Sequence, residues 1–193
     1  MKEILSIHLG QTGCQIGENQ WDLYSTEHGI DASGALSNEY DLNGASTFFH
    51  ETGNKKYIPR AVFFDSEPSV VDKIKQSSAK KFDSTTFLSG KEDFASNYAI
   101  GKYSNGVNYV EFVLDEIRRK LDYVSSPQAI FLYRSLGSGT GGGFGSLLLE
   151  KLNELDYKIP VIQFVTLPDP QKSPVVIEPY LRFFKIVLKL IPV

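Results

Sequence analysis

The chain has 193 residues, of which 41% are apolar and 12% aromatic, and it carries a net charge of −3 at neutral pH. A chain of this length can bury one sizeable core but not two, so we expect a single domain over residues 1–193. The acidic balance argues against nucleic-acid or membrane partners, because no excess of Lys or Arg is available to neutralise phosphates or lipid head groups.

The cysteine content and the first residues indicate the redox compartment. Cys14 is the one cysteine, which excludes an internal disulfide and a cysteine-based metal site. The first residues lack the apolar run of a signal peptide, and no stretch of about 18 apolar residues occurs. We therefore expect a protein of the reducing cytoplasm, with Cys14 buried as a small apolar side chain.

The amino-terminal segment predicts a strand, a glycine turn and a helix. Residues 3–9 are mostly apolar and of strand length. Residues 10–17 contain glycines at their start, middle and end, and they lead into a helical pattern that continues to Tyr24. Residues 31–46 are polar and glycine-bearing, which indicates a surface loop.

The middle of the chain alternates strands and helices. Residues 56–64 predict a second strand, and residues 87–88 predict a short third one. Residues 66–74 predict a helix, because serine can cap its start and proline fits its first turn. Residues 105–124 predict a long amphipathic helix whose apolar stripe contains Val110, Val113, Leu114, Ile117 and Leu121.

The most informative segment is residues 134–146, which has six glycines in nine residues. It comes after an apolar strand at residues 129–133 and precedes a leucine-rich helix at residues 144–155. Glycine lets backbone N–H groups converge on one point, and the next helix directs the positive end of its dipole there. The arrangement predicts a phosphate cradle; the alternative is an ordinary tight turn or flexible linker.

The carboxyl-terminal part completes the alternation. Residues 159–167 predict a strand, and three prolines force a loop over residues 168–174. We therefore expect a doubly wound, mostly parallel α/β sheet, with both glycine segments at the switch point where nucleotides bind. Residues 180–191 predict a helix that lies on the sheet and leaves an apolar patch exposed, which favours self-association.

Five motifs carry a family resemblance: GQTGCQIG (10–17), EHGI (27–30), FFHETG (48–53), PRAVFFDSEP (59–68) and GKED (90–93). Together they resemble the amino-terminal domain of tubulin, and the alpha subunit rather than beta or gamma. The resemblance is near-continuous to about residue 180 and implies the Rossmann-like tubulin/FtsZ GTPase fold, with GTP and Mg²⁺ as cofactors. It also implies a structural role in microtubules, a beta-tubulin-like partner and a place in the cytoplasmic cytoskeleton.

The resemblance also implies site residues. It assigns nucleotide binding to Gly10, Gln11, Thr12, Gln15, Asp93, Ala95, Ser96, Ser135, Gly137, Ser138, Gly139, Thr140, Gly141 and Glu178. It places Asp65 and Glu67 near Mg²⁺, which prefers hard carboxylate oxygens. Taken alone, Asp65 is better explained as a strand-end turn residue and Glu67 as a first-turn acid favoured by the helix dipole; the two glycine segments together favour the metal role instead. Tubulins have glycine in place of Ser138, and a serine held at positive φ would cost about 1 kcal/mol.

The end of the chain departs from the family, with residues 181–193 as a divergent tail. The resemblance therefore implies a truncated alpha-tubulin-like domain, without the intermediate and carboxyl-terminal domains. It would also lack the loop that supplies the catalytic acid, so that GTP hydrolysis is slow or absent. One alternative is an NAD(P)-dependent oxidoreductase, because residues 137–142 fit Gly-x-Gly-x-x-Gly. A second is a tubulin remnant that binds no nucleotide. His8, His28 and His50 lack metal-ligand spacing and predict structural roles.

Overall fold

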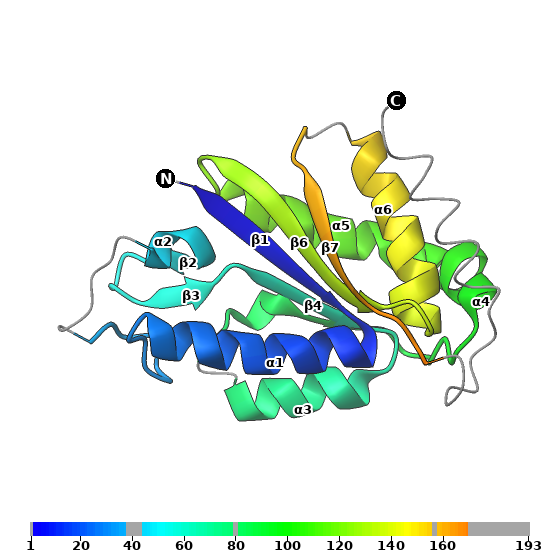
Figure 1. Cartoon of the computed structure of the whole chain (residues 1–193), viewed down its shortest axis with the longest axis horizontal. Coiled ribbons are helices and arrows are strands. Elements are labelled where there is room, and N and C mark those ends of the chain that lie inside the picture. Colours follow the sequence, from blue (N-terminus) through cyan, green and yellow to red (C-terminus); the bar gives the residue numbers. More distant parts are fainter. Residues whose placement is uncertain (1, 38–43, 79–80, 156–157, 170–193) are drawn as a thin grey trace.

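The computed structural model describes residues 2–37, 44–78, 81–155 and 158–169 (Figure 1). Its elements in chain order are β1 (Glu3–Leu9), α1 (Gly10–Glu27), α2 (Ala45–Phe48), β2 (Phe49–Glu51), β3 (Tyr57–Pro59), β4 (Ala61–Asp65), α3 (Pro68–Ser78), the 3₁₀ turn η1 (Ser84–Thr86), β5 (Phe87–Ser89), α4 (Tyr98–Tyr103), α5 (Val107–Asp122), β6 (Pro127–Ser135), the π-helix η2 (Gly139–Phe144), α6 (Gly145–Glu154) and β7 (Val161–Thr166). None of the helices in these ranges has both the length and the apolar character to cross a membrane. The helix predicted at residues 180–191 lies outside the described residues.

Five strands form one parallel sheet in the order β5-β4-β1-β6-β7 (Figure 1). The chain starts at the central strand β1, moves outward to β4 and β5, and returns to the other side of β1 for β6 and β7. This confirms the doubly wound parallel α/β sheet. Leu9 at the end of β1 is in register with Arg134 of β6. The segments after these two strands therefore begin next to each other.

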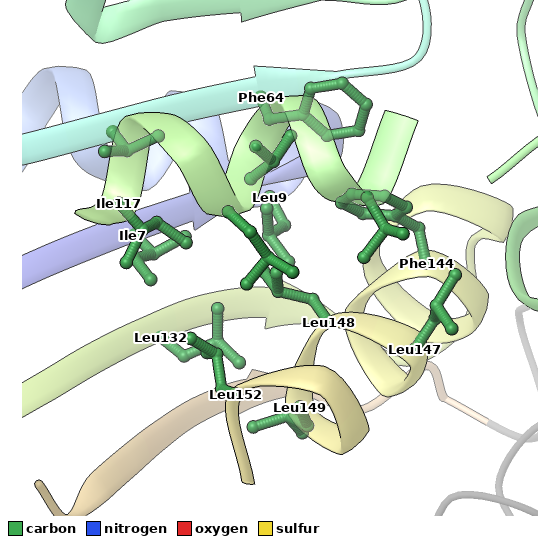
Figure 2. Close-up of a cluster of buried hydrophobic side chains, with 14 of the residues drawn as sticks. Ile7, Leu9, Phe64, Ile117, Leu132, Phe144, Leu147, Leu148, Leu149 and Leu152 are labelled. Carbon is green, nitrogen blue, oxygen red and sulfur yellow. The ribbon is translucent and has the colours of Figure 1, made fainter. Parts of the chain in front are cut away.

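Helices cover both faces of the sheet (Figure 1). On one face, Phe64 of β4 belongs to the apolar cluster of Figure 2, together with Ile117 of α5 and Leu148 of α6. On the other face, Phe63 of the same strand packs in a second cluster with Trp21 of α1. Because neighbouring residues of β4 enter different clusters, all five of its residues are buried. A strand covered on both faces appears in the sequence as a continuous apolar run.

Helix α1 begins at Gly10, directly after β1, so the first glycine segment forms helical turns rather than a separate loop. The helix approaches the sheet closely, because a Cβ at Gly13 would lie 2.4 Å from the carbonyl oxygen of Tyr133. The His8 ring stacks against the rings of Phe63 and Tyr133, at centroid distances of 4.6 and 4.8 Å. His8 therefore packs in the core beneath α1, where Cys14 is also fully buried.

Arg60 divides the strand predicted at residues 56–64. β3 before it pairs antiparallel with β2 in a separate two-stranded sheet, and β4 after it joins the main sheet. The buried Arg60 guanidinium pairs with Glu3 and donates a hydrogen bond to the carbonyl oxygen of Tyr123. A buried charge needs such partners, and they hold the chain at the point where it changes sheets. The sequence patterns do not predict β2, α2 or α4, none of which exceeds six residues.

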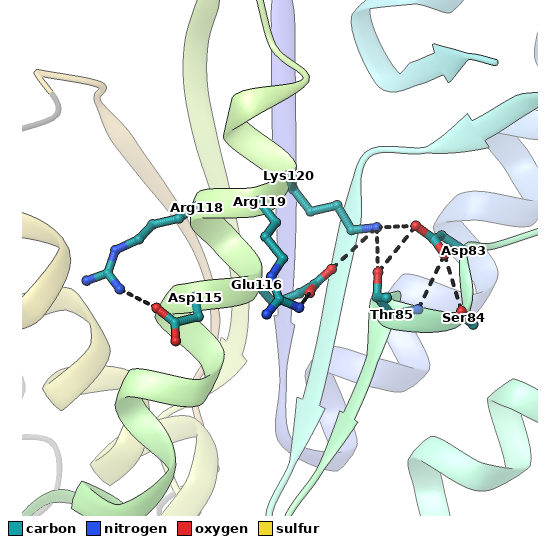
Figure 3. Close-up of polar contacts among 8 residues, drawn as sticks. All are labelled: Asp83, Ser84, Thr85, Asp115, Glu116, Arg118, Arg119 and Lys120. Atoms are coloured by element: carbon teal, nitrogen blue, oxygen red, sulfur yellow. Dashed lines mark hydrogen bonds and ion pairs between the residues drawn. The ribbon is translucent and has the colours of Figure 1, made fainter. Parts of the chain in front are cut away.

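A charged network joins α5 to the segment before β5 (Figure 3). Lys120 Nζ lies 3.1 Å from Asp83 Oδ2 and 3.5 Å from Glu116 Oε1. Asp115 and Arg118 form a second ion pair on the exposed side of α5. The network lies at the amino-terminal end of β5. It is therefore at the opposite end of the sheet from the carboxyl ends of the strands.

Candidate functional site

A polar cavity of about 330 Å³ lies at the carboxyl end of the sheet. Its walls come from the start of α1, the end of β4, the segment after β5 and the loop after β6. The lining residues are Gly10, Gln11, Asp65, Glu67, Asp93, Ala95, Ser96, Ser138 and Thr140. Each of them is a residue that the resemblance implies for nucleotide or metal binding. The fold thus brings four separate segments of the implied site around one cavity.

Ser138 precedes the π-helical part of the glycine loop, and its backbone is extended, with φ −116° and ψ 160°. The expectation of a serine strained by positive φ is therefore wrong. A residue that caps a helix adopts the extended region and offers its side-chain oxygen to a free N–H group. Ser138 Oγ accepts such a bond from the amide of Gly141 at 2.9 Å. Gly10, the glycine that lines the cavity, does have a positive φ, at 70°.

Backbone packing requires the glycines of this loop. A Cβ at Gly139 would lie 2.5 Å from the carbonyl oxygen of Phe94, and one at Gly143 would lie 2.3 Å from that of Tyr98. Helix α4 meets the same loop, since a Cβ at Gly101 would lie 2.0 Å from the carbonyl oxygen of Gly139. These distances are well inside van der Waals contact, so a side chain at any of these positions would displace the backbone of a neighbouring segment.

Asp65 ends β4 and links two walls of the cavity. Its Oδ1 accepts hydrogen bonds from the amide of Ser66 at 2.8 Å and from Thr140 Oγ1 at 3.2 Å. Burial raises the pKa of Asp65 to about 6, and the charge of Asp93 acts in the same direction, while the bonds from Ser66 and Thr140 oppose it. Asp65 is thus ionised at neutral pH in a place where the protein only partly compensates its charge. Such a carboxylate favours a cation beside it.

The segment after β5 forms a turn that packs against the glycine loop. Asp93 Oδ1 accepts a hydrogen bond from the amide of Ala95 at 2.8 Å, and the Ala95 carbonyl oxygen accepts one from the amide of Gly139 at 2.8 Å. Ala95 has φ 49°, a left-handed conformation that is uncommon for a residue with a Cβ. Phe94 is fully buried in the apolar cluster and anchors the turn from below. Strained backbone persists where its surroundings fix it in this way.

Arg134, the last residue but one of β6, is a site residue that the sequence patterns do not predict. Its side chain is fully buried behind the glycine loop and does not line the cavity. Nη1 donates a hydrogen bond to the carbonyl oxygen of Gly141 at 2.8 Å, and Nη2 donates one to Gln163 Oε1 at 2.8 Å. Burial lowers the pKa of Arg134 to about 9, which leaves the guanidinium protonated at neutral pH. The sequence feature that could have indicated this role is an arginine placed between an apolar strand and a glycine loop.

The donor set of the cavity fits Mg²⁺. Asp65, Glu67 and Asp93 supply hard carboxylate oxygens at its walls. Mg²⁺ keeps several waters and needs only one or two protein groups besides phosphate oxygens. Within the described residues, no group of three or more His, Cys, Asp or Glu side chains is placed to hold a metal ion. The residues present therefore fit an ion shared between protein and phosphate.

The other implied nucleotide residues do not line this cavity. Thr12 and Gln15 belong to α1, where Gln15 is exposed. The remaining ones belong to β6 and the glycine loop and are Ser135, Gly137, Gly139 and Gly141. Ser135 Oγ accepts a hydrogen bond from the amide of Gly137 at 3.3 Å. Glu178 lies outside the described residues.

The strand order, the switch point beside β1 and the glycine segments that meet there define a nucleotide-binding α/β domain of the Rossmann-like class. Comparison with protein families identifies the group within that class. Residues 3–186 match the model described as "Tubulin/FtsZ family, GTPase domain", and the chain belongs to this family. Membership in a family of GTPase domains implies GTP as the nucleotide.

The curated relatives of the chain include many alpha-tubulins. It is 46% identical over 184 residues to the tubulin alpha-2 chain of Caenorhabditis elegans and 45% identical over 186 residues to the tubulin alpha chain of Pneumocystis carinii. It is 44% identical over 186 residues to the tubulin alpha-2B chain of Physarum polycephalum. Each comparison covers 93% of this chain and 41% of the relative, so the chain spans about two fifths of their length. The resemblance to alpha-tubulin is confirmed, and the oxidoreductase alternative has no support.

Proposed function

We propose that this chain binds GTP together with Mg²⁺ in the polar cavity, as the GTPase domain of an alpha-tubulin-like protein. The observation that carries the proposal is the meeting of two glycine segments and a buried carboxylate around one space. Gly10 and Gln11 come from α1, Ser138 and Thr140 from the glycine loop, and Asp65 from β4. Phosphates at this edge would lie near the amino-terminal ends of α1 and of the glycine-loop helix η2, whose positive dipole ends stabilise anions.

The proposed Mg²⁺ completes the charge balance of the cavity. Phosphates placed beside Asp65, Glu67 and Asp93 meet three carboxylates, and like charges at short range repel. Asp65, Glu67 and Asp93 would hold a divalent cation, which would offset that repulsion. The hydroxyl of Thr140 orients the Asp65 carboxylate by donating a hydrogen bond to Oδ1. When bound, the ion supplies charge neutralisation for the terminal phosphates.

We propose in addition a protein partner of the tubulin family, either a beta-tubulin-like subunit or a second copy of this chain, in the cytoplasmic cytoskeleton. The support comes from β7, which ends the described sheet and pairs there with β6 alone. Three apolar side chains of β7 and Leu167, which follows the strand, are between 37 and 58% exposed; the three are Ile162, Phe164 and Val165. An apolar edge strand of this kind favours association with another chain.

A nucleotide titration tests the binding proposal. We expect calorimetry to show GTP binding that strengthens with Mg²⁺, and no binding of NADPH. Asp65→Asn is expected to weaken GTP binding in Mg²⁺ by about tenfold or more, the size of one lost charged interaction. Asp115→Asn removes an exposed carboxylate on α5 and serves as the matched control, with GTP affinity unchanged. NADPH binding, or no nucleotide binding at all, would reject the proposal.

The partner proposal has its own test. Sedimentation velocity is run on the chain alone and with beta-tubulin, comparing the natural sequence with Ile162→Lys. We expect the lysine on the exposed strand to reduce association, because a charged side chain on an edge strand opposes pairing. Leu23→Lys is the control, since Leu23 is 56% exposed but lies on α1. A chain that sediments as a monomer both alone and in the presence of beta-tubulin would contradict the proposed partner.

A further inference from the structure

The guanidinium of Arg134 lies immediately behind the glycine wall of the cavity. Nη1 is 2.8 Å from the carbonyl oxygen of Gly141 and 3.4 Å from that of Gly142. A Cβ at Gly145, the first residue of α6, would lie 2.7 Å from the same Nη1. The buried cation therefore lies beside the junction at which η2 continues into α6. A buried positive charge at this point favours an anion nearby.

Gly141 separates this cation from the cavity. Its carbonyl oxygen faces Arg134, and its amide donates to the Oγ of Ser138, which lines the cavity. A buried charge is screened much less than a surface charge, so it acts across a wall one residue thick. Asp65 and Asp93, which line the cavity, carry negative charge. The positive charge that would favour phosphates therefore comes from Arg134, which lies behind the glycine loop.

We propose that Arg134 is a positioning residue that fixes the carbonyl groups of Gly141 and Gly142 and sets the preference of the cavity for the more highly charged phosphates. In P-loop proteins a loop lysine contacts the phosphates directly, and residues 134–146 contain no lysine. Arg134 supplies a positive charge without touching the ligand. This role rests on the proposed binding of GTP.

Gln163→Glu isolates the charge of Arg134 from its hydrogen bonds. Gln163 Oε1 accepts from Arg134 Nη2 at 2.8 Å, and a glutamate there keeps an acceptor while it neutralises the guanidinium. The bond from Nη1 to the glycine loop stays in place. Gln128→Glu adds the same charge to an exposed position at the far end of β6 and is the matched control. Arg134→Lys keeps the charge, and Arg134→Met removes it with the hydrogen bonds.

The measurement is the ratio of GTP to GMP affinity for each variant, by calorimetry in excess Mg²⁺. We expect Gln163→Glu to lower this ratio about tenfold, the size of one nearby unit charge in a partly buried setting, and Gln128→Glu to leave it unchanged. Arg134→Lys should retain more of the ratio than Arg134→Met. A purely structural side chain would change both affinities alike and leave the ratio as it is.

The outcomes separate the two proposals. If the natural chain binds GTP and Gln163→Glu keeps its ratio, the role of Arg134 is overturned and GTP binding stands. If the natural chain binds no GTP, both are overturned. Should Arg134→Met fail to fold, which circular dichroism would reveal, the comparison of Gln163→Glu with Gln128→Glu decides.

Discussion

The hydroxyl oxygen of Ser138 accepts the amide hydrogen of Gly141, so the loop occupies one of its own N–H groups with a side chain that lines the cavity. Ser138→Ala frees that amide for a phosphate oxygen. We expect GTP affinity to rise about fivefold, which corresponds to one net hydrogen bond of about 1 kcal/mol. The empty protein should lose about 1 kcal/mol of stability, because the cap is gone.

Calorimetry and thermal unfolding measure the two effects of Ser138→Ala. Ser138→Thr keeps the hydroxyl and is expected to change neither quantity appreciably. A weaker binding of GTP by the alanine variant would show instead that the hydroxyl itself donates to the phosphate. In that case the hydrogen bond to Gly141 serves to aim the hydroxyl.

Asp65→Asn is expected to stabilise the empty protein while it weakens binding. Burial raises the pKa of Asp65 to about 6 from an ordinary 3.8, so the ionised form is unfavourable in the folded state. At pH 7.5 the neutral amide should raise the free energy of unfolding by up to about 3 kcal/mol, from two pKa units of about 1.4 kcal/mol each. Urea unfolding without nucleotide measures the change. Asp115→Asn on exposed α5 should stay within about 0.5 kcal/mol, and a less stable Asp65→Asn would disprove the expectation.

The acid stability of the chain should depend on His8 and Asp65 in opposite directions. Burial lowers the pKa of His8 to about 3 from an ordinary 6.5, so its stabilising contribution exists above pH 6.5 and is lost as pH falls toward 3. The raised pKa of Asp65 gives a contribution that is complete below its ordinary value of 3.8 and is lost as pH rises through about 6. Protonation of Asp65 therefore offsets part of the loss at His8.

Unfolding free energies measured from pH 7 to pH 4 check this balance. Asp65→Asn should make stability fall more steeply with acid, because the offset is absent. His8→Gln should flatten the curve, although the loss of its stacking against Phe63 and Tyr133 lowers stability at every pH. Identical slopes for the natural chain and Asp65→Asn would refute the linkage.

Gly101→Ala should damage the site without touching a ligand. The new Cβ would lie 2.0 Å from the carbonyl oxygen of Gly139, so α4 and the glycine loop must move apart. We expect a loss of about 1–3 kcal/mol in stability, typical of overpacking, together with weaker GTP binding. Gly53→Ala is the control, because its Cβ would have no atom within 4 Å. Thermal unfolding that shows equal stability for the two variants would contradict the close packing described for α4.

The sheet is predictable from local sequence patterns, whereas the residues of the cavity are implied by the resemblance to tubulin. Apolar runs mark the strands and glycine segments mark the turns after them, and the parallel order then gathers Gly10, Asp65 and Thr140 at one edge. The break at Arg60 is not local, because it depends on Glu3, which lies 57 residues earlier. The inward orientation of the Arg134 side chain likewise depends on a residue distant in sequence, Gln163 of β7, which accepts its hydrogen bond.

The conformation of Ser138 shows a different limit of sequence reasoning. A serine in place of a family glycine suggests strain, yet glycine at a position does not establish that the position needs positive φ. Here the extended backbone suits any residue, and the hydroxyl serves as a cap. Backbone angles of this kind depend on which N–H groups the fold leaves free, and the pattern of residue types does not contain that information.

The close contact between the loop glycines and neighbouring carbonyl groups limits which mutations can tune this cavity. A Cβ at Gly139 or Gly143 would lie within 2.5 Å of a backbone carbonyl oxygen. Variants at these positions would therefore misfold, whichever nucleotide the cavity accepts. In a deep mutational scan these positions would score as intolerant even in a selection that never uses the ligand. Adaptive change has room at Ser138, which lines the cavity and is half-buried, whereas Thr140 is buried and bonded to Asp65 and Ser66. Ser138 is also the position at which the resemblance implies a glycine in tubulins.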